Sequence, residues 1–269
     1  MGRLCGVVIP VNSSSHYAFG KEELPSTKVA VVIPSYNERG NLTELLPAVL
    51  DELNSTPMKG VVVVVDDNSP DLTADLVTEI QRKYQNLLLF KRPRKSGLGS
   101  AYIEAFRRLI SDPQYHVFIQ MDADFSHPPS TIRKLVSKLA KGPDVVIASR
   151  YVKDGGSTGW SRIRHVLSLG FNLLVRLTTG VGVHDSTSGY RALSRKAVVL
   201  LINHPLRSGG FAYQIESLTV FLRGRMSISE VPFLFRQRSH GQSKISILEI
   251  PPLLKVLLHM VAAKRFRSS

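Results

Sequence analysis

The sequence predicts an α/β protein with a mostly parallel sheet and helices on both of its faces. From residue 28 to residue 148, short runs rich in valine and isoleucine alternate with longer segments of helical periodicity. The strand-like runs are almost continuously apolar, as expected for strands covered on both sides. A chain of 269 residues with 43% hydrophobic content can also bury one large core.

The first half of this region contains three predicted strands separated by two helices. Residues 28–33 are apolar and are followed by a proline, and residues 61–65 are an unbroken valine run. Between them, residues 42–53 have apolar side chains at helical spacing. Residues 72–84 are the second predicted helix, and residues 87–90 are the third strand. The order is that of successive β-α-β units.

The second half repeats the pattern with two further strands. Helical spacing over residues 101–110 precedes a strand at residues 115–121. A helix at residues 129–140 leads to a strand at residues 145–148, and residues 211–222 form a later packed helix. Parallel strands need crossover connections of this length, so the second half supports the same sheet.

Polar side chains follow four of these strands. Parallel strands of an α/β sheet end at one edge, and ligands bind beyond that edge. The segments that follow the strands are PSYNE (34–38), DDNS (66–69), DAD (122–124) and SRY (149–151). Three of them carry carboxylates and the fourth carries an arginine, which predicts one ligand site built from all four.

The pair Asp122 and Asp124 is the most informative feature of this edge. Side chains alternate along a strand, so residues i and i+2 point the same way. Two hard oxygen ligands suit Mg²⁺ or Mn²⁺, which in turn can hold a nucleotide diphosphate. The alternative is a strand that ends in an ordinary polar turn.

Charge and cysteine content limit the class of partner. Lysine and arginine number 35 against 21 aspartate and glutamate residues, so the net charge is +14 and an anionic partner is expected. The sequence has no zinc-finger spacing and no basic low-complexity arm, so we expect no nucleic acid. The single cysteine, Cys5, excludes an intrachain disulfide and fits a reducing compartment.

Three regions follow from the pattern along the chain. Residues 1–27 are expected to be an N-terminal extension and residues 28–244 the main domain. Residues 245–269 predict a C-terminal amphipathic helix, which would lie on an anionic membrane or pack on its own domain. No apolar run reaches transmembrane length.

A set of ordered motifs resembles glycosyltransferase family 2, and within it the dolichyl-phosphate (polyprenyl-phosphate) mannosyltransferases. The resemblance covers roughly residues 28–255. The motifs are IPSYNE (33–38), VDDNSPD (65–71), GLGSAY (97–102), MDADFSHP (121–128), SRY (149–151), Gly156 with Trp160, DSTSGYR (185–191) and RSHGQSK (238–244). Singly each motif is weak, and in this order they are specific.

The resemblance implies a GT-A (Rossmann-like) fold and a divalent cation, Mg²⁺ or Mn²⁺. It assigns the nucleotide sugar to Pro34, Tyr36, Glu38, Asp66, Asp67, Asp122, Ala123, Asp124, Arg238 and Lys244. Asp122 and Asp124 match the metal motif. Ser126 stands where some relatives carry a glutamine ligand, so it is a third candidate ligand.

The resemblance also implies the acceptor and the reaction. Arg150, Arg164 and Ser168 match positions that receive the acceptor phosphate, and Asp122, Asp124 and Arg150 are the implied catalytic residues. The implied reaction is inverting transfer of mannose from GDP-mannose to dolichyl or polyprenyl phosphate. A phosphate monoester with a second pKa of about 6 is already ionised, so no general base is assigned.

The implied location is the cytosolic face of a membrane, as a peripheral protein, at the endoplasmic reticulum if the source is eukaryotic. Residues 166–175 are expected to reach the membrane beside the acceptor site, and small membrane-anchoring subunits are candidate partners. Two alternatives stay open. One is a UDP-glucose or UDP-N-acetylglucosamine polyprenyl-phosphate glycosyltransferase, and the other is a non-catalytic basic membrane or nucleic-acid binding module on the same fold.

Overall fold

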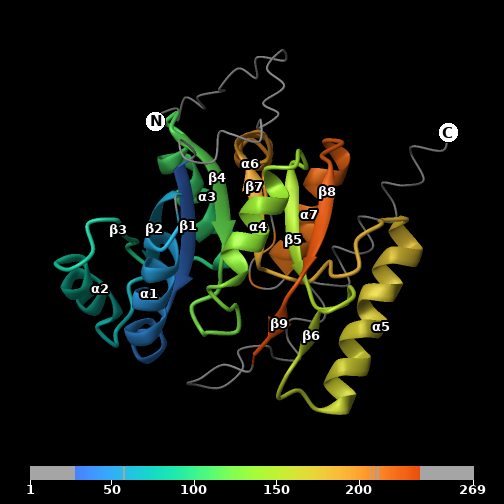
Figure 1. Ribbon diagram of the computed structural model, residues 1–269, viewed down its shortest axis with the longest axis horizontal. Helices are drawn as coiled ribbons and strands as arrows, with labels where there is room; N and C mark the ends of the chain where they lie inside the picture. The colour runs from blue at the N-terminus through green and yellow to red at the C-terminus, as the bar shows by residue number, and fades with distance from the viewer. Residues whose placement is uncertain (1–27, 57, 207, 209, 211, 237–269) are drawn as a thin grey trace, which may run out of the picture.

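The computed structural model describes residues 28–236 except 57, 207, 209 and 211. Its main feature is a seven-stranded sheet with the order β3-β2-β1-β4-β7-β5-β8 (Figure 1). The strands are β1 (Lys28–Ser35), β2 (Lys59–Asp66), β3 (Leu87–Lys91), β4 (Tyr115–Gln120), β5 (Val145–Ser149), β7 (Arg191–Ser194) and β8 (Ile228–Pro232). A separate two-stranded sheet pairs β6 (Gly156–Ser157) with β9 (Leu234–Phe235).

The large sheet is mostly parallel, as predicted. The pairs β1–β2, β1–β4, β2–β3 and β5–β8 are parallel. Strand β7 is the exception, because it runs antiparallel to both β4 and β5 and lies between them. The chain therefore enters β7 at the edge where β4 and β5 end.

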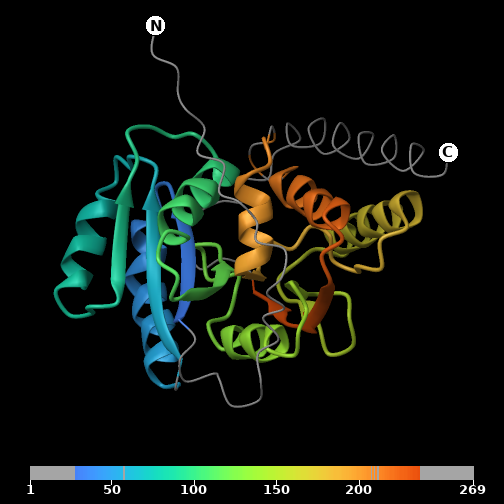
Figure 2. The same cartoon turned by 90° about the horizontal axis from the view of Figure 1, so that it is seen from above.

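Helices cover both faces of the sheet, in agreement with the prediction (Figures 1 and 2). One core cluster joins the sheet to α1 (Arg39–Asn54), α2 (Thr73–Gln81) and α4 (Thr131–Leu139). The other joins it to α3 (Leu98–Leu109), α6 (Arg195–Ile202) and α7 (Ala212–Arg223). Strand β1 shows why its sequence is continuously apolar: Val29, Val31 and Ile33 face the first cluster, and Ala30 and Val32 face the second.

Helix α5 (Arg162–Thr179) belongs to neither layer and lies along one side of the molecule (Figures 1 and 2). The hydroxyl of Ser161 caps it by accepting a hydrogen bond from the Arg164 amide. It ends at Gly180, whose φ of 69° is the left-handed conformation that favours glycine after a helix. The sequence marked this segment as apolar and did not predict a helix.

Two predicted features lie outside the described residues: the N-terminal extension at 1–27 and the C-terminal amphipathic helix at 245–269. Within the described part of the chain, no helix combines the length and the apolar character needed to cross a membrane.

Candidate active site

The segments that were predicted to share one edge of the sheet do so. Ser35 pairs with Asp66 at the ends of β1 and β2, and Arg191 at the start of β7 pairs with both Gln120 and Ile147. The carboxyl ends of β1, β2, β4 and β5 therefore meet at the lower edge in Figure 1. The segment that leads into β7 enters at the same edge.

The two central carboxylates lie in the loop after β4 and not in the strand. Because β4 ends at Gln120, one residue before the predicted end of the strand, the alternation of strand side chains does not set their directions. The side chain of Asp122 is 39% exposed, whereas Asp124 is buried. An oxygen of Asp124, Oδ1, accepts a hydrogen bond from the Ser126 amide at 3.1 Å, which fixes the turn between them.

The buried side chain of His127 is hydrogen-bonded to this loop. Its Nδ1 accepts a hydrogen bond from the Asp122 amide at 3.0 Å, and its Nε2 lies 3.7 Å from Oδ2 of Asp122. The imidazole stacks on Tyr190 with ring centroids 4.6 Å apart. Burial lowers the pKa of His127, so the ring is neutral and its one proton lies on Nε2, facing the Asp122 carboxylate.

The loop offers oxygen ligands of the kind that a divalent cation needs. Besides the carboxylates of Asp122 and Asp124 on either side of Ala123, Ser126 contributes a buried hydroxyl that has no hydrogen-bond partner among the described residues. No group of three histidine, cysteine or acidic side chains that could hold a metal occurs in the part of the chain that the structure describes. Mg²⁺ commonly needs only one or two protein carboxylates, because substrate phosphates and water supply its other ligands. The residues present fit such an ion.

Three residues that the sequence assigns to the nucleotide lie at the end of β1 or just after it. Pro34, Tyr36 and Glu38 are all partly exposed. The ammonium group of Lys95 lies 4.1 Å from the centre of the Tyr36 ring, a cation–π contact. The carboxylate of Glu38 accepts a hydrogen bond from Nδ2 of Asn41 at 2.7 Å, which ties it to the first turn of α1.

The two carboxylates at the end of β2, Asp66 and Asp67, are both buried and hydrogen-bonded. Asp66 accepts hydrogen bonds from the amide and hydroxyl of Ser69 at 3.0 and 2.5 Å. Asp67 accepts from Nη1 of Arg92 at 2.5 Å and from the Ser96 amide at 3.0 Å. Both oxygens of Asp67 thus anchor the loop after β3 to the end of β2.

Arg150, at the end of β5, is held by a buried ion pair. Its backbone N–H donates to Oδ2 of Asp185 at 2.9 Å, and Nε and Nη2 donate to the two carboxylate oxygens at 2.7 Å each. Nη2 also donates to Thr187 at 2.8 Å. Burial alone would lower the pKa of Arg150, but the attraction and hydrogen bonds of Asp185 outweigh it and raise that pKa.

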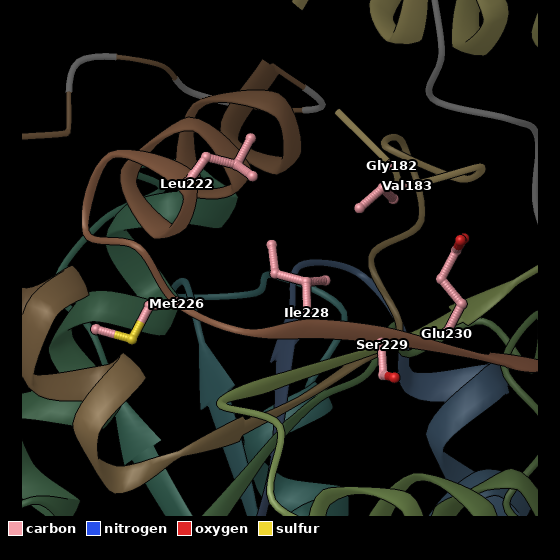
Figure 3. A pocket seen from close by; sticks show the side chains of 7 residues that line it. All are labelled: Gly182, Val183, Leu222, Met226, Ile228, Ser229 and Glu230. Atoms are coloured by element: carbon pink, nitrogen blue, oxygen red, sulfur yellow. The ribbon is translucent and has the colours of Figure 1, made fainter. Parts of the chain in front are cut away.

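Side chains from β8 and β7 hold the segment that carries Asp185 by hydrogen bonds. Glu230 accepts hydrogen bonds from the amides of His184 and Asp185 at 2.9 and 3.0 Å and pairs with the His184 ring at 2.8 Å. Arg191 donates to two carbonyls of the same segment at 2.8 and 3.0 Å. Glu230 also lines a hollow of about 340 Å³ beside β8, together with residues of α7 and of the segment before Asp185 (Figure 3).

Helix α5 brings the other two predicted acceptor residues to Arg150. Arg164 and Ser168 are one turn apart, so they share a face. The guanidinium groups of Arg150 and Arg164 lie 5.0 and 4.4 Å from the Trp160 ring centre, and the Tyr151 hydroxyl donates to Ser168 Oγ at 2.6 Å. The side chains of Trp160 and Tyr151 therefore connect Arg150, Arg164 and Ser168.

Arg238 and Lys244 lie outside the described residues. The last described residue before them is Arg236, whose amide donates to the Ser126 carbonyl at 3.3 Å. The chain therefore passes the DAD loop just before the segment that contains them.

Five residues of this edge were not assigned to the site from the sequence: Arg92, His127, Tyr151, Asp185 and Glu230. Four of them could have been identified from the sequence. Arg92 lies two residues after a predicted strand, and His127, Tyr151 and Asp185 lie in the ordered motifs. Glu230 lies within a strand and outside every motif, so only the three-dimensional structure identifies it.

Comparison with known proteins agrees with this geometry. The sequence matches the family described as Glycosyl transferase family 2 over residues 30–200. It is 36% identical over 223 residues to the polyprenol monophosphomannose synthase of Mycolicibacterium smegmatis, covering 82% of each chain. It is 37% identical over 221 residues to the dolichol-phosphate mannosyltransferase of Pyrococcus furiosus, covering 81% of this chain and 59% of that protein.

Solved structures share the fold at low sequence identity. The glucosyl-3-phosphoglycerate synthase of Mycobacterium tuberculosis with phosphoglyceric acid superposes with a TM-score of 0.63 at 19% identity, over 88% of this chain and 80% of that one. The same enzyme with Mn²⁺, UDP-glucose and phosphoglyceric acid gives a TM-score of 0.62 at 19% identity, with the same coverage. The predicted GT-A fold is confirmed, and the chain is a glycosyltransferase that belongs to glycosyl transferase family 2.

Proposed function

We propose that this enzyme transfers mannose, with inversion, from GDP-mannose to the phosphate of a polyprenol or dolichol. The observation that carries the proposal is the gathering of Arg150, Arg164 and Ser168 around Trp160 and Tyr151, at the edge of the sheet where the loop of Asp122 and Asp124 also lies. This arrangement provides one group of ligands for a donor diphosphate and another for an acceptor phosphate. The names of relatives at 36% and 37% identity support mannose as the sugar and a polyprenyl phosphate as the acceptor.

On the donor side, Asp122 and Asp124 would hold Mg²⁺ or Mn²⁺, with Ser126 as a third candidate ligand. When bound, the cation would neutralise the charge that grows on the leaving diphosphate. The structural neighbour that was solved in complex with Mn²⁺ and UDP-glucose supports a divalent ion. Tyr36 and the loop held by Asp67 would flank the nucleotide.

On the acceptor side, Arg164 and Ser168 are partly exposed and Arg150 is nearly buried. The guanidinium groups would neutralise the lipid phosphate and hold it in place. An ionised phosphate oxygen attacks the sugar from the side opposite the diphosphate, so the bond to the leaving group breaks as the new bond forms and the configuration inverts. The nucleophile carries its own charge, so the mechanism uses no general base.

Radiolabelled sugar transfer tests the proposal directly. Purified protein is incubated with labelled GDP-mannose, a short-chain polyprenyl phosphate and Mg²⁺ or Mn²⁺, with and without chelator. We expect metal-dependent label in the lipid phase and its loss in Asp124→Asn. Label from UDP-glucose or UDP-N-acetylglucosamine alone would show that this nucleotide sugar, and not GDP-mannose, is the donor. No label from any donor with folded protein would favour the non-catalytic binding module.

Helix α5 supports the further proposal that the enzyme works on a membrane surface. Its outward side chains are apolar, with exposed fractions between 44% and 73%: Ile163, Val166, Leu167, Leu169, Leu173, Leu174 and Leu177. Its inward face carries the buried Val175 and the buried Asn172, whose side-chain oxygen accepts a hydrogen bond from the Ser186 amide at 2.8 Å. Most of the large apolar side chains of α5 therefore face outward, and apolar surface of this extent marks an interaction site.

The charge near α5 favours an anionic membrane as its partner. Arg162 is exposed in the first turn of the helix, and the whole chain carries a charge of +14. Docked in this way, the helix would place Arg164 and Ser168 at the level of lipid phosphates. We place the enzyme on the cytosolic face of a membrane, at the endoplasmic reticulum in a eukaryote, with small membrane-anchoring subunits as candidate partners.

Flotation with acidic liposomes tests this location. Leu167 and Leu177 are 67% and 73% exposed, and burying most of a leucine contributes about 1.5 kcal/mol. Changing both to serine should therefore weaken binding by roughly a hundredfold. Leu72→Ser is the matched control, because Leu72 is 57% exposed on another element. Equal flotation of all the variants would refute docking through α5.

A further inference from the structure

A hydrogen bond between two hydroxyl groups joins the segment after β5 to α5. The phenol of Tyr151 donates to Oγ of Ser168 at 2.6 Å. A phenol is a stronger acid than an aliphatic alcohol, and an alcohol oxygen is the better acceptor, so this is the favoured direction of the bond. With Tyr151 as donor, the hydrogen of Ser168 is available to another acceptor.

The surroundings of Tyr151 keep its proton in place. Burial raises the pKa of Tyr151, so the hydroxyl stays protonated near neutral pH. The Arg150 guanidinium lies 5.3 Å from the Tyr151 ring centre, and the His165 ring meets it edge-on at 6.1 Å. These contacts hold the ring whether or not the hydroxyl is present.

Ser168 itself has limited freedom. It lies on the inward face of α5, and its carbonyl accepts a hydrogen bond from Nδ2 of Asn172 at 2.9 Å. Its hydroxyl, however, can rotate until a neighbour fixes it. The contact with Tyr151 excludes the direction toward the phenol oxygen, so the serine hydrogen points away from Tyr151 before any substrate arrives.

We propose that Tyr151 is a positioning residue, which orients the Ser168 hydroxyl as a hydrogen-bond donor to the phosphate of the acceptor. The inference rests on the proposed acceptor site and adds to it a residue that acts through another. A hydrogen bond to a charged group is stronger when its donor is already aligned, because no rotational freedom is lost on binding. No bond to Tyr151 is made or broken in the reaction.

The variant Tyr151→Phe separates this role from packing, since it removes one oxygen and keeps the ring contacts. The measurements are the binding of a short-chain prenyl phosphate by calorimetry and the KM values of acceptor and donor. Ser168→Ala should weaken acceptor binding about tenfold or more, and Tyr151→Phe about threefold. The double variant should be no worse than Ser168→Ala, because Tyr151 acts only through the serine. The donor KM should not change.

Tyr84→Phe is the matched control. Its hydroxyl donates to Asp51 at 3.1 Å, far from this edge of the sheet, so its removal should leave prenyl-phosphate binding unchanged. Tyr151→Phe with wild-type acceptor binding, or a double variant whose losses are additive, would overturn the inference. A wild type that does not bind prenyl phosphate would overturn both the inference and the acceptor assignment. Binding without mannose transfer would overturn the proposed reaction alone, and the binding ratios would still decide the role of Tyr151.

Discussion

Replacing Asp185 with asparagine should destabilise the protein strongly and weaken its hold on the acceptor. The change keeps the shape of the side chain and removes the counter-charge of Arg150, whose side chain is 6% exposed against 0% for that of Asp185. If the amide oxygen takes the place of Oδ2, the amide nitrogen faces Nη2 of Arg150, and two donors then oppose each other.

The size of the effect follows from burial. Removing one partner of a buried ion pair costs about 3–5 kcal/mol, because the other charge is left without compensation. For a protein of this size each 1 kcal/mol lowers the melting temperature by about 2–4 °C, so we expect a fall of about 6–20 °C. Arg150 would also be free to turn away from the acceptor, which should raise the acceptor KM more than the donor KM.

Thermal unfolding by circular dichroism, together with both KM values, measures these effects. Asp112→Asn is the control, because Asp112 pairs with Lys28 at 3.5 Å on the surface and its loss should leave the midpoint unchanged. Combining Asp185→Asn with Arg150→Met removes both charges and should recover part of the stability. An Asp185→Asn variant that melts with the wild type would falsify the ion-pair argument.

Three further predictions concern the same edge of the sheet. His127→Phe keeps an aromatic ring and removes the acceptor of the Asp122 amide, so Mn²⁺ affinity measured by EPR in the presence of GDP should fall about tenfold; unchanged affinity would show that the loop does not need His127. Arg92→Met leaves the buried Asp67 without its counter-charge, and urea unfolding should show a loss of about 3 kcal/mol with a raised donor KM; a normal donor KM would contradict the role of this pair in the predicted nucleotide site. Trp160→Leu removes the ring between two guanidinium groups, and the acceptor KM should rise several-fold at an unchanged donor KM, since each cation–π contact contributes about 0.5–2 kcal/mol; a rise in both constants would indicate a general loss of structure.

The parallel part of the fold was predictable because each of its strands is a local signal. Unbroken apolar runs such as residues 29–33 record burial on both faces, and the structure confirms them. Strand β7 could not be predicted in the same way. It has four residues, and its antiparallel direction depends on contacts with β4 and β5 that its own sequence does not encode.

The candidate site was predictable only where it depends on the ends of the parallel strands. The predicted strand ends located the carboxylates and Arg150, because the polar groups that bind ligands in a parallel sheet lie beyond the carboxyl ends of its strands. Their partners were not visible: Asp67 meets Arg92 across 25 positions, and Arg150 meets Asp185 across 35. The alternation of strand side chains gives no direction for Asp122, since β4 ends two residues before it.

The antiparallel insertion of β7 has a consequence for how the enzyme is assembled. Strands β4 and β5 are complete before β7 is synthesised, yet β4 is paired only with β1, and β5 has no neighbour in the sheet until residues 191–194 arrive. Pairing across such long separations is slow, because the chain must lose loop entropy before the contacts form. A nascent or truncated chain that stops before Asp185 would therefore expose one edge of β4 and both edges of β5, which invite aggregation, and would leave Arg150 without its counter-ion.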